Sequence, residues 1–390
     1  MGKRRKPSNN QFQGELFARS ERRPRSGLVL GRLLADEADK LIHRGDQQDR
    51  AYEILKHWAD LERNGNLRTK ETALEASFLQ EVFGQALGYK EATHDPQNYQ
   101  LEHKFPVPGG QTADAALGNF KAGQPRPPLV VIELKGADVD LDRDRSGGRT
   151  PVQQCWEYLI HLPPDCPWGI LSNFVTFRLY HRSKTPLSYE HFRLQDLRDV
   201  KRFRQFYCLF ERGGLVTAPP GQCPRALRLL HQTENRQREV GDELYGAYSE
   251  NRRLLIQHLQ FKLGKALGQA ILIAQKILDR IVFVAFCEDR DLLQAKCLET
   301  AYADLPPFSK VTNPRWQNYL RLFRGVDEGP PRMPYLARGY DGLLFRHDPE
   351  VDDLELDDEW THFFRQIGTY DFRDEVNVEV LGHLFERSLS

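Results

Sequence analysis

The spacing of hydrophobic residues changes along the chain and predicts two kinds of structure. Residues 71–89 (ETALEASFLQEVFGQALGY) carry apolar side chains at helical spacing, and Gly88 stands where that helix would end. Residues 128–136 (PLVVIELKG) form a short apolar run rich in β-branched side chains, which predicts a buried strand. From residue 225 onward the helical period dominates, in long stretches at 225–259 and 266–293.

Shorter patterns predict the remaining elements of the first part. They are a strand around Asp114, a helix carrying Gln154 and Tyr158 on one face, two strands within 167–181 joined by a turn at Ser172–Asn173, and helices within 189–215. The predicted order is helix, strands, helix, strand, strand, and it contains the pattern αβββαβ.

These elements divide the chain into three segments. We expect a basic, partly disordered tail at residues 1–45 with a short helix at 29–41, an α/β (α+β) unit at 46–214, and a mainly α-helical domain at 215–390. Glycines and prolines between residues 213 and 221 predict the linker between the last two segments.

The candidate chemistry lies in the first part. Glu133 and Lys135 flank Leu134 at the end of the predicted strand, and residues two apart in a strand point to the same side. Asp114 on a neighbouring strand would add a second carboxylate. Two carboxylates and a backbone carbonyl can hold Mg²⁺, which acidifies bound water and neutralises charge on a phosphoryl group. The pattern predicts a divalent-metal site with a lysine beside it; alternatively, Asp114 is a turn or surface carboxylate.

This segment resembles nucleases of the PD-(D/E)xK type, which have a restriction-endonuclease-like αβββαβ core. Gln154 and Tyr158 match the QxxxY motif that follows ExK in type I and type IIG restriction–modification enzymes. The resemblance implies that Asp114 and Glu133 bind Mg²⁺, with Mn²⁺ as a substitute, and that Lys135 is catalytic. It also implies that Gln154 orders the catalytic site or contacts DNA together with Tyr158. The alternative for that pair is an ordinary surface and core position on a helix.

The family also places an acidic residue on its first helix. Glu75 stands at the matching position, so the resemblance implies a third metal-binding carboxylate there. Glu71 and Glu81 lie on the same predicted helix, and a solvated surface role is the alternative for Glu75. The proline that precedes the family's aspartate is replaced by Ala113.

The helical part is similar to the connector of type IIG enzymes. Residues 274–293 (AQKILDRIVFVAFCEDRDLL) and 381–390 (LGHLFERSLS) resemble two of its signatures, the second of which leads into an adenine-specific DNA methyltransferase. This sequence has no NPPY-type motif and no glycine-rich site for S-adenosylmethionine. The resemblance implies that a methyltransferase and a target-recognition domain act in cis or in trans, and that S-adenosylmethionine binds only through them.

Charge is unevenly distributed although the formal net charge is zero. Lys3, Arg4, Arg5 and Lys6 make the first residues basic, and residues 348–359 are acidic. A basic segment can grip the phosphates of double-stranded DNA, so we expect these four side chains to contribute to DNA binding. A disordered solubilising tail is the alternative.

Several observations bound the location of the protein. The six cysteines show no metal-binding spacing, which favours reduced thiols in a cytoplasmic protein. No signal peptide is recognisable, and charged residues interrupt the apolar stretch at 266–286, which favours a buried helix over a membrane span. Residues 138–145 (DVDLDRDR) lack the pattern of a calcium loop, so we expect a mobile loop near DNA.

Three functions are therefore open. The first is a Mg²⁺-dependent DNA endonuclease module of a restriction–modification or phage-defence system, in which a double-strand break would require two modules as a dimer or sequential nicking. The second is a non-catalytic scaffold for an adenine-specific DNA methyltransferase. The third is an unrelated metal-dependent or regulatory protein in which the three charged residues meet by accident.

Overall fold

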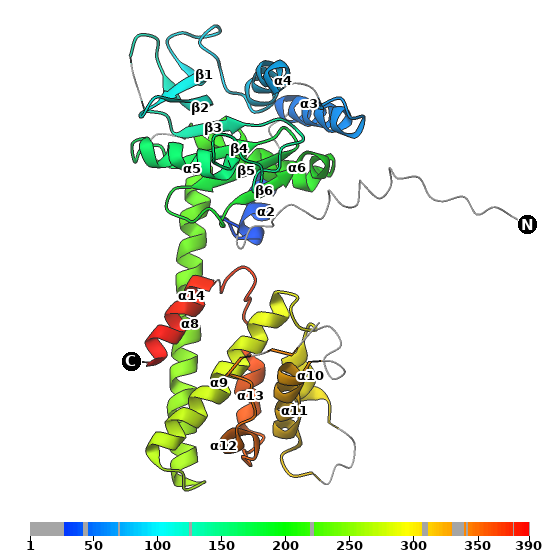
Figure 1. Ribbon diagram of the computed structural model, residues 1–390, viewed down its shortest axis with the longest axis vertical. Coiled ribbons are helices and arrows are strands. Elements are labelled where there is room, and N and C mark those ends of the chain that lie inside the picture. Colours follow the sequence, from blue (N-terminus) through cyan, green and yellow to red (C-terminus); the bar gives the residue numbers. More distant parts are fainter. Residues whose placement is uncertain are drawn as a thin grey trace, which may run out of the picture. The chain divides into compact units, whose positions relative to one another are not determined.

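The computed structural model describes residues 27–41, 46–68, 71–124, 127–218, 222–305, 311–329, 339–340, 342–376 and 378–389 (Figure 1). The basic residues Lys3, Arg4, Arg5 and Lys6 lie outside them. The chain forms two compact units, Met1–Thr233 and Glu234–Ser390.

The division falls later than the expected boundary at residue 214. It lies within α8 (Arg225–Phe261), because the start of this helix packs in the core of the first unit through Ala226, Leu229 and Leu230.

A six-stranded mixed sheet organises the first unit. Its strands follow one another in the order β1-β2-β3-β4-β5-β6, and every neighbouring pair is antiparallel except β3 and β4. The strands are β1 (Tyr99–Val107), β2 (Gln111–Phe120), β3 (Val130–Leu134), β4 (Trp168–Ser172), β5 (Thr176–His181) and β6 (Glu190–Arg193). The parallel pair needs a crossover, and α5 (Pro151–His161) provides it. The elements from α4 (Glu71–Phe78) to β4 therefore follow the expected order αβββαβ.

Helices cover both faces of this sheet. One face packs against α3 (Asp46–Arg63), the helix that begins with α4, and α6 (Val200–Phe210), and alternate residues of β3, such as Ile132, belong to that core. The other face packs against α5, where Val131 of β3 meets Tyr158 and Leu159. Because successive strand residues face opposite sides, β3 is buried along its whole length.

The helix predicted at 71–89 changes its winding partway along. It is α-helical over α4 and continues as the π-helix η1 (Leu79–Ala86), and Gly88 follows with a φ of +80°. Phe78 stands at the change and is fully buried. Its ring lies 5.0 Å from that of Trp58 and 4.9 Å from that of Phe174, measured between centroids.

The end of the first unit differs from the helical prediction for residues 189–215. The segment opens with strand β6, in which Glu190 and Phe192 are buried and the alternate residues are partly exposed, and this pairs with β5. Helical structure begins only after it, with η2 (Leu194–Arg198), α6 and α7 (Arg212–Leu215). An alternating pattern of four residues is too short to distinguish from a helix by sequence.

Part of the expected tail also belongs to the folded core. The backbone amides of Leu28 and Val29 donate hydrogen bonds of 2.7 and 2.8 Å to Glu190 Oε1. The helix α2 (Gly31–Lys40) follows, as predicted, and Leu34 packs in the core of the first unit. The apolar residues at 28–34 supply the burial that a basic tail would lack.

The second unit is helical throughout its described elements. After α8 it contains α9 (Leu267–Asp289), α10 (Cys297–Ala303), α11 (Pro314–Glu328), α12 (Pro349–Asp352), α13 (Trp360–Ile367) and α14 (Val378–Leu389). Arg280 in the centre of α9 is fully buried, and its Nη1 donates a 2.7 Å hydrogen bond to Asp352. Among the described helices, none has the length and apolarity that a membrane span needs.

The buried ring of Phe78 leads to a stability prediction. Phe78→Ala should lower the free energy of unfolding of the first unit by about 3–5 kcal/mol, because the cavity is surrounded by aromatic rings that cannot collapse into it. Urea unfolding of the whole chain, with hydrogen exchange reporting on each unit, would measure it. Ile160→Ala is the control, because that side chain is 69% exposed and should change stability by less than about 0.5 kcal/mol.

Candidate functional site

The register of β2 and β3 brings Asp114 to Glu133. Ala116 pairs with Val131 and Ala115 pairs with Ile132, so the next position along β2 lies across from Glu133. The regular ladder ends there. The Asp114 side chain continues it, because the backbone amide of Leu134 donates a 2.7 Å hydrogen bond to Asp114 Oδ2. The two carboxylates therefore meet at the end of β3.

Glu133 and Lys135 lie on the same side of the chain. The Lys135 ammonium donates a hydrogen bond to Glu133 Oε1, and the Lys135 amide extends the pairing with β4 by donating to Ser172 O at 2.8 Å. Glu133 is only 2% exposed. Its second oxygen, Oε2, is buried and accepts no hydrogen bond of regular geometry from the described residues, although the nearby Tyr158 hydroxyl interacts with this carboxylate. A buried carboxylate oxygen without a donor is costly unless a ligand satisfies it.

The surroundings of Glu133 oppose its ionisation. Burial is the largest cause and the negative charge of Asp114 is the second, and together they raise the pKa of Glu133 to about 7 despite the neighbouring Lys135 ammonium. A carboxyl whose pKa lies near neutral pH, beside a second carboxylate, would ionise fully if a cation bound between them.

A lysine that the sequence pattern did not single out completes the site. Lys104 Nζ donates to Asp114 Oδ1 at 2.8 Å and forms an ion pair with Glu75 Oε1 at 2.5 Å. Lys104 lies on β1 across from Asp114, since His103 pairs with Ala115 and Phe105 pairs with Ala113. The Gly109–Gly110 turn between the two strands carries the signal for this register, because it centres the hairpin.

The carboxylates of Glu75 and Glu81, on one continuous helix, have different partners. Glu75 is buried and reaches Asp114 through Lys104, whereas Glu81 accepts a 2.9 Å hydrogen bond from the Trp58 indole. The side chain of Glu71 is outside the described part of the chain.

Helix α5 presents the two residues of the QxxxY pattern. Gln154 Nε2 donates to the Tyr158 hydroxyl at 2.6 Å, and that hydroxyl donates to Thr112 O on β2 at 3.3 Å. The helix starts where it does because Thr150 and Gln153 form a reciprocal capping box, with Pro151 in the first turn. Tyr158 is buried and Gln154 is partly exposed, so Gln154 is the member that a ligand could reach.

The loop between Lys135 and α5, which includes residues 138–145, makes two contacts with the strand region of the sheet. Arg178 on β5 donates two hydrogen bonds, of 3.0 and 2.8 Å, to the carboxylate of Asp142. Asn173 Nδ2 donates to Val139 O at 3.0 Å. Arg178 is buried, so this bidentate pair fixes the loop to the sheet.

Asp114 and Glu133 suit a hard divalent cation. They provide carboxylate oxygens on adjacent strands, and Glu133 Oε2 is buried without a hydrogen bond of regular geometry. In the described part of the chain, no three Asp, Glu, His or Cys side chains come together as a metal-binding group. Glu75 is separated from the pair by the Lys104 ammonium.

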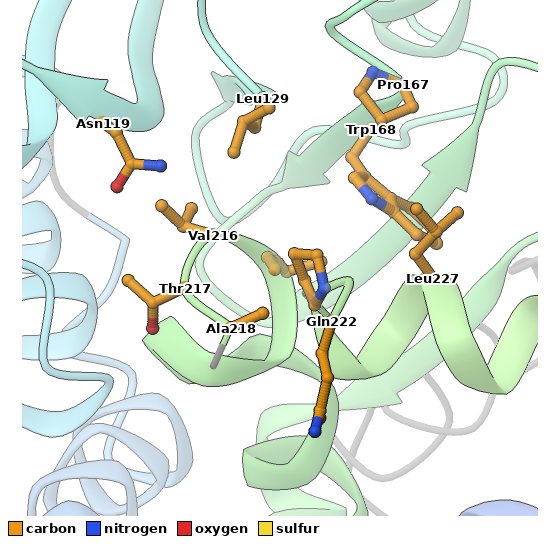
Figure 2. A pocket seen from close by; sticks show the side chains of 11 residues that line it. Asn119, Leu129, Pro167, Trp168, Val216, Thr217, Ala218, Gln222 and Leu227 are labelled. Carbon is orange, nitrogen blue, oxygen red and sulfur yellow. The ribbon is translucent and has the colours of Figure 1, made fainter. Parts of the chain in front are cut away.

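A pocket lies where β3 and β4 begin, at the other end of these strands from Glu133 (Figure 2). It has a volume of about 350 Å³ and is lined by Asn119, Leu129, Trp168, Val216 and Leu227, among others. The described residues that line it include no acidic or basic side chain. It is distinct from the cluster around Asp114 and Glu133, which lies where β3 ends.

Comparison with known proteins finds one weak structural similarity and no sequence relative. No protein-family model matches the chain, and no curated protein matches its sequence. It aligns with a cryo-electron-microscopy structure of a DrdV–DNA complex at 12% identity and a TM-score of 0.27, over 87% of this chain. The alignment covers 29% of the other chain, so this sequence spans less than a third of its length. A TM-score of 0.27 does not establish a shared fold.

The raised pKa of Glu133 predicts a pH-dependent stability. The folded protein holds this proton up to about pH 7, whereas the unfolded chain releases it near the ordinary value of 4.5. The resulting stabilisation is present below pH 4.5 and is lost as the pH rises through 7. In EDTA, Glu133→Gln should therefore flatten the fall in unfolding free energy between pH 5 and 8, by roughly 1–3 kcal/mol.

The readout is the slope of stability against pH, because Lys135 loses its partner in the variant at every pH. Equal slopes for the two proteins in urea titrations would show that Glu133 ionises normally in the fold.

Proposed function

We propose that the first unit is a Mg²⁺-dependent DNA endonuclease of the PD-(D/E)xK type, with a restriction-endonuclease-like core. The observation that supports this most directly is the convergence of Asp114, Glu133 and Lys135 from adjacent strands, with Glu133 Oε2 buried and without a hydrogen bond of regular geometry. Structural ion pairs usually satisfy both oxygens of a buried carboxylate. A buried carboxylate oxygen close to a second carboxylate is typical of a cation-binding site.

Each side chain has a chemical role in this proposal. Asp114 and Glu133 hold Mg²⁺ or Mn²⁺, which supplies an acidified water and neutralises charge on the phosphoryl oxygens. The Lys135 ammonium, next to Glu133, orients the attacking water and stabilises the charge that develops on phosphorus-bound oxygen. Gln154, held by Tyr158, contacts the DNA or orders the site from the α5 side.

The wider assignment rests on the sequence motifs. QxxxY at Gln154–Tyr158 and the connector signatures at 274–293 and 381–390 favour a type IIG-like restriction–modification or phage-defence system. In that setting a methyltransferase and a target-recognition domain, in cis or in trans, would supply S-adenosylmethionine binding and base readout. A double-strand break would need two such sites as a dimer, or sequential nicking by one.

Loss of Lys135 tests the catalytic assignment. Lys135→Ala should reduce nicking of supercoiled plasmid in Mg²⁺ or Mn²⁺ by at least about 100-fold, because it removes a contact made in the transition state. Its melting temperature should stay within a few degrees of wild type, because Glu133 can bind a proton when it loses the Lys135 ammonium. EDTA should stop the wild-type reaction.

The matched control is Lys90→Ala. Lys90 is a half-exposed lysine of the same unit whose nearest carboxylate, Asp95, is 3.7 Å away, and its loss should leave nicking unchanged. Equal cleavage by wild type and Lys135→Ala would remove Lys135 from the mechanism. If wild type stays inactive even with a methyltransferase and target-recognition half added, the scaffold role is favoured instead.

Removal of either carboxylate tests the metal site. Asp114→Asn and Glu133→Gln should each weaken Mn²⁺ binding about tenfold or more in calorimetry, because each removes a charged oxygen ligand. Unchanged affinity in both variants would exclude this pair as the metal site, whatever the cleavage result.

A further inference from the structure

Lys104 joins two carboxylates that belong to different elements. Its ammonium lies 2.8 Å from Asp114 Oδ1 on β2 and 2.5 Å from Glu75 Oε1 on α4. Both carboxylates are mostly buried, with side-chain exposures of 15% and 11%, whereas the Lys104 side chain is 57% exposed. The cation is therefore the one member of the trio that can leave without disturbing the core.

The backbone at Lys104 is unusual for a lysine. It has a φ of +50° within strand β1, a left-handed conformation that costs a non-glycine residue free energy. The strand pairing with β2 continues on both sides of it. Such conformations persist where the surroundings enforce them, and here Lys104 lies between two paired residues of β1 and makes the two ion pairs.

Each oxygen of Asp114 already has a donor in the metal-free protein. Its Oδ2 accepts from the Leu134 amide and its Oδ1 accepts from Lys104. Glu133 is different, because its Oε2 is buried, lacks a hydrogen bond of regular geometry and lies next to the Asp114 charge. A divalent cation could take Glu133 Oε2 directly, but it could take Asp114 Oδ1 only if the Lys104 ammonium moved away.

The net charge of the cluster also favours replacement of Lys104 by a divalent cation. When Glu133 is ionised together with Glu75 and Asp114, the two ammonium groups of Lys104 and Lys135 leave the cluster with one net negative charge. When Lys104 leaves, the cluster carries −2, which one divalent cation neutralises. Lys104 and the metal are therefore alternative counterions at Asp114 Oδ1.

We infer that Lys104 is a tethered cation that occupies the metal site of the metal-free protein and competes with the divalent ion for Asp114 and Glu75. This inference rests on the proposed function for the identity of the ion as a divalent metal. It makes metal loading an exchange of one cation for another. It also gives Glu75 a place in the site without direct contact between Glu75 and Asp114.

Calorimetric titration with Mn²⁺ tests the exchange. Lys104→Met keeps the length of the side chain and removes the charge, so the variant should bind Mn²⁺ about tenfold more tightly than wild type. Lys104→Arg keeps a competing cation that pairs bidentately with carboxylates, and it should bind Mn²⁺ no more tightly than wild type. Lys90→Met is the matched control and should leave the affinity unchanged.

Thermal unfolding separates exchange from a purely structural role. In EDTA, Lys104→Met should melt below wild type, because Glu75 and Asp114 lose their counterion. In saturating Mn²⁺ that difference should shrink or reverse, since the metal replaces the ammonium. A structural lysine would lower the melting temperature equally in both buffers.

Equal Mn²⁺ affinity of wild type and Lys104→Met would overturn the inference, as would tighter binding by Lys104→Arg. If Lys104→Met does not fold in EDTA, recovery of its fold by Mn²⁺ would support the exchange, and failure to recover would overturn it. Absence of Mn²⁺ binding in every variant would also overturn it, while metal-dependent nicking by wild type would show that the proposed function still holds.

Discussion

The hydrogen bond from the Leu134 amide to Asp114 Oδ2 is the contact on which the candidate site depends. Backbone pairing between β2 and β3 stops at Ala115 and Ile132, and the carboxylate then takes the place of a backbone acceptor. A side chain used in this way is fixed in position and orientation. It places a negative charge beside Glu133, whose own strand β3 is buried along its whole length.

This placement brings two carboxylates close enough to repel each other, and neighbouring ammonium groups offset the repulsion. Burial and the charge of Asp114 raise the pKa of Glu133, and ammonium groups approach from both sides, Lys135 on Glu133 and Lys104 on Asp114. The hydrogen bonds of Lys104 to Asp114 and Glu75 outweigh its own partial burial and raise its pKa, so it stays charged. The site is thus held together by two ammonium groups, while its carboxylates lie on strands and a helix.

Two contacts around the cluster support the positions of Asp114 and Glu133. Tyr158 ties α5 to β2 through Thr112 O, and the buried pair of Arg178 with Asp142 ties the loop after Lys135 to β5. The first tie holds a helix to the strand that carries Asp114, and the second holds the loop that follows β3 to the far part of the sheet. A site that must hold charged groups close together needs such support, because repulsion would otherwise separate them.

The sequence by itself determined the elements and the chemistry of single strands. Alternation and composition placed Glu133 and Lys135 on one side of β3, predicted the helix of Gln154 and Tyr158, and separated the sheet-containing part from the helical part, because these are local periodicities. Only the tertiary structure decided which charges meet. Lys104 faces Asp114 through the register of a hairpin, Glu75 rather than Glu81 approaches through the packing of α4, and Arg178 reaches Asp142 across the sheet. Strand β6 and the core position of residues 28–34 likewise depend on partners distant in the chain, and local patterns carry no information about those partners.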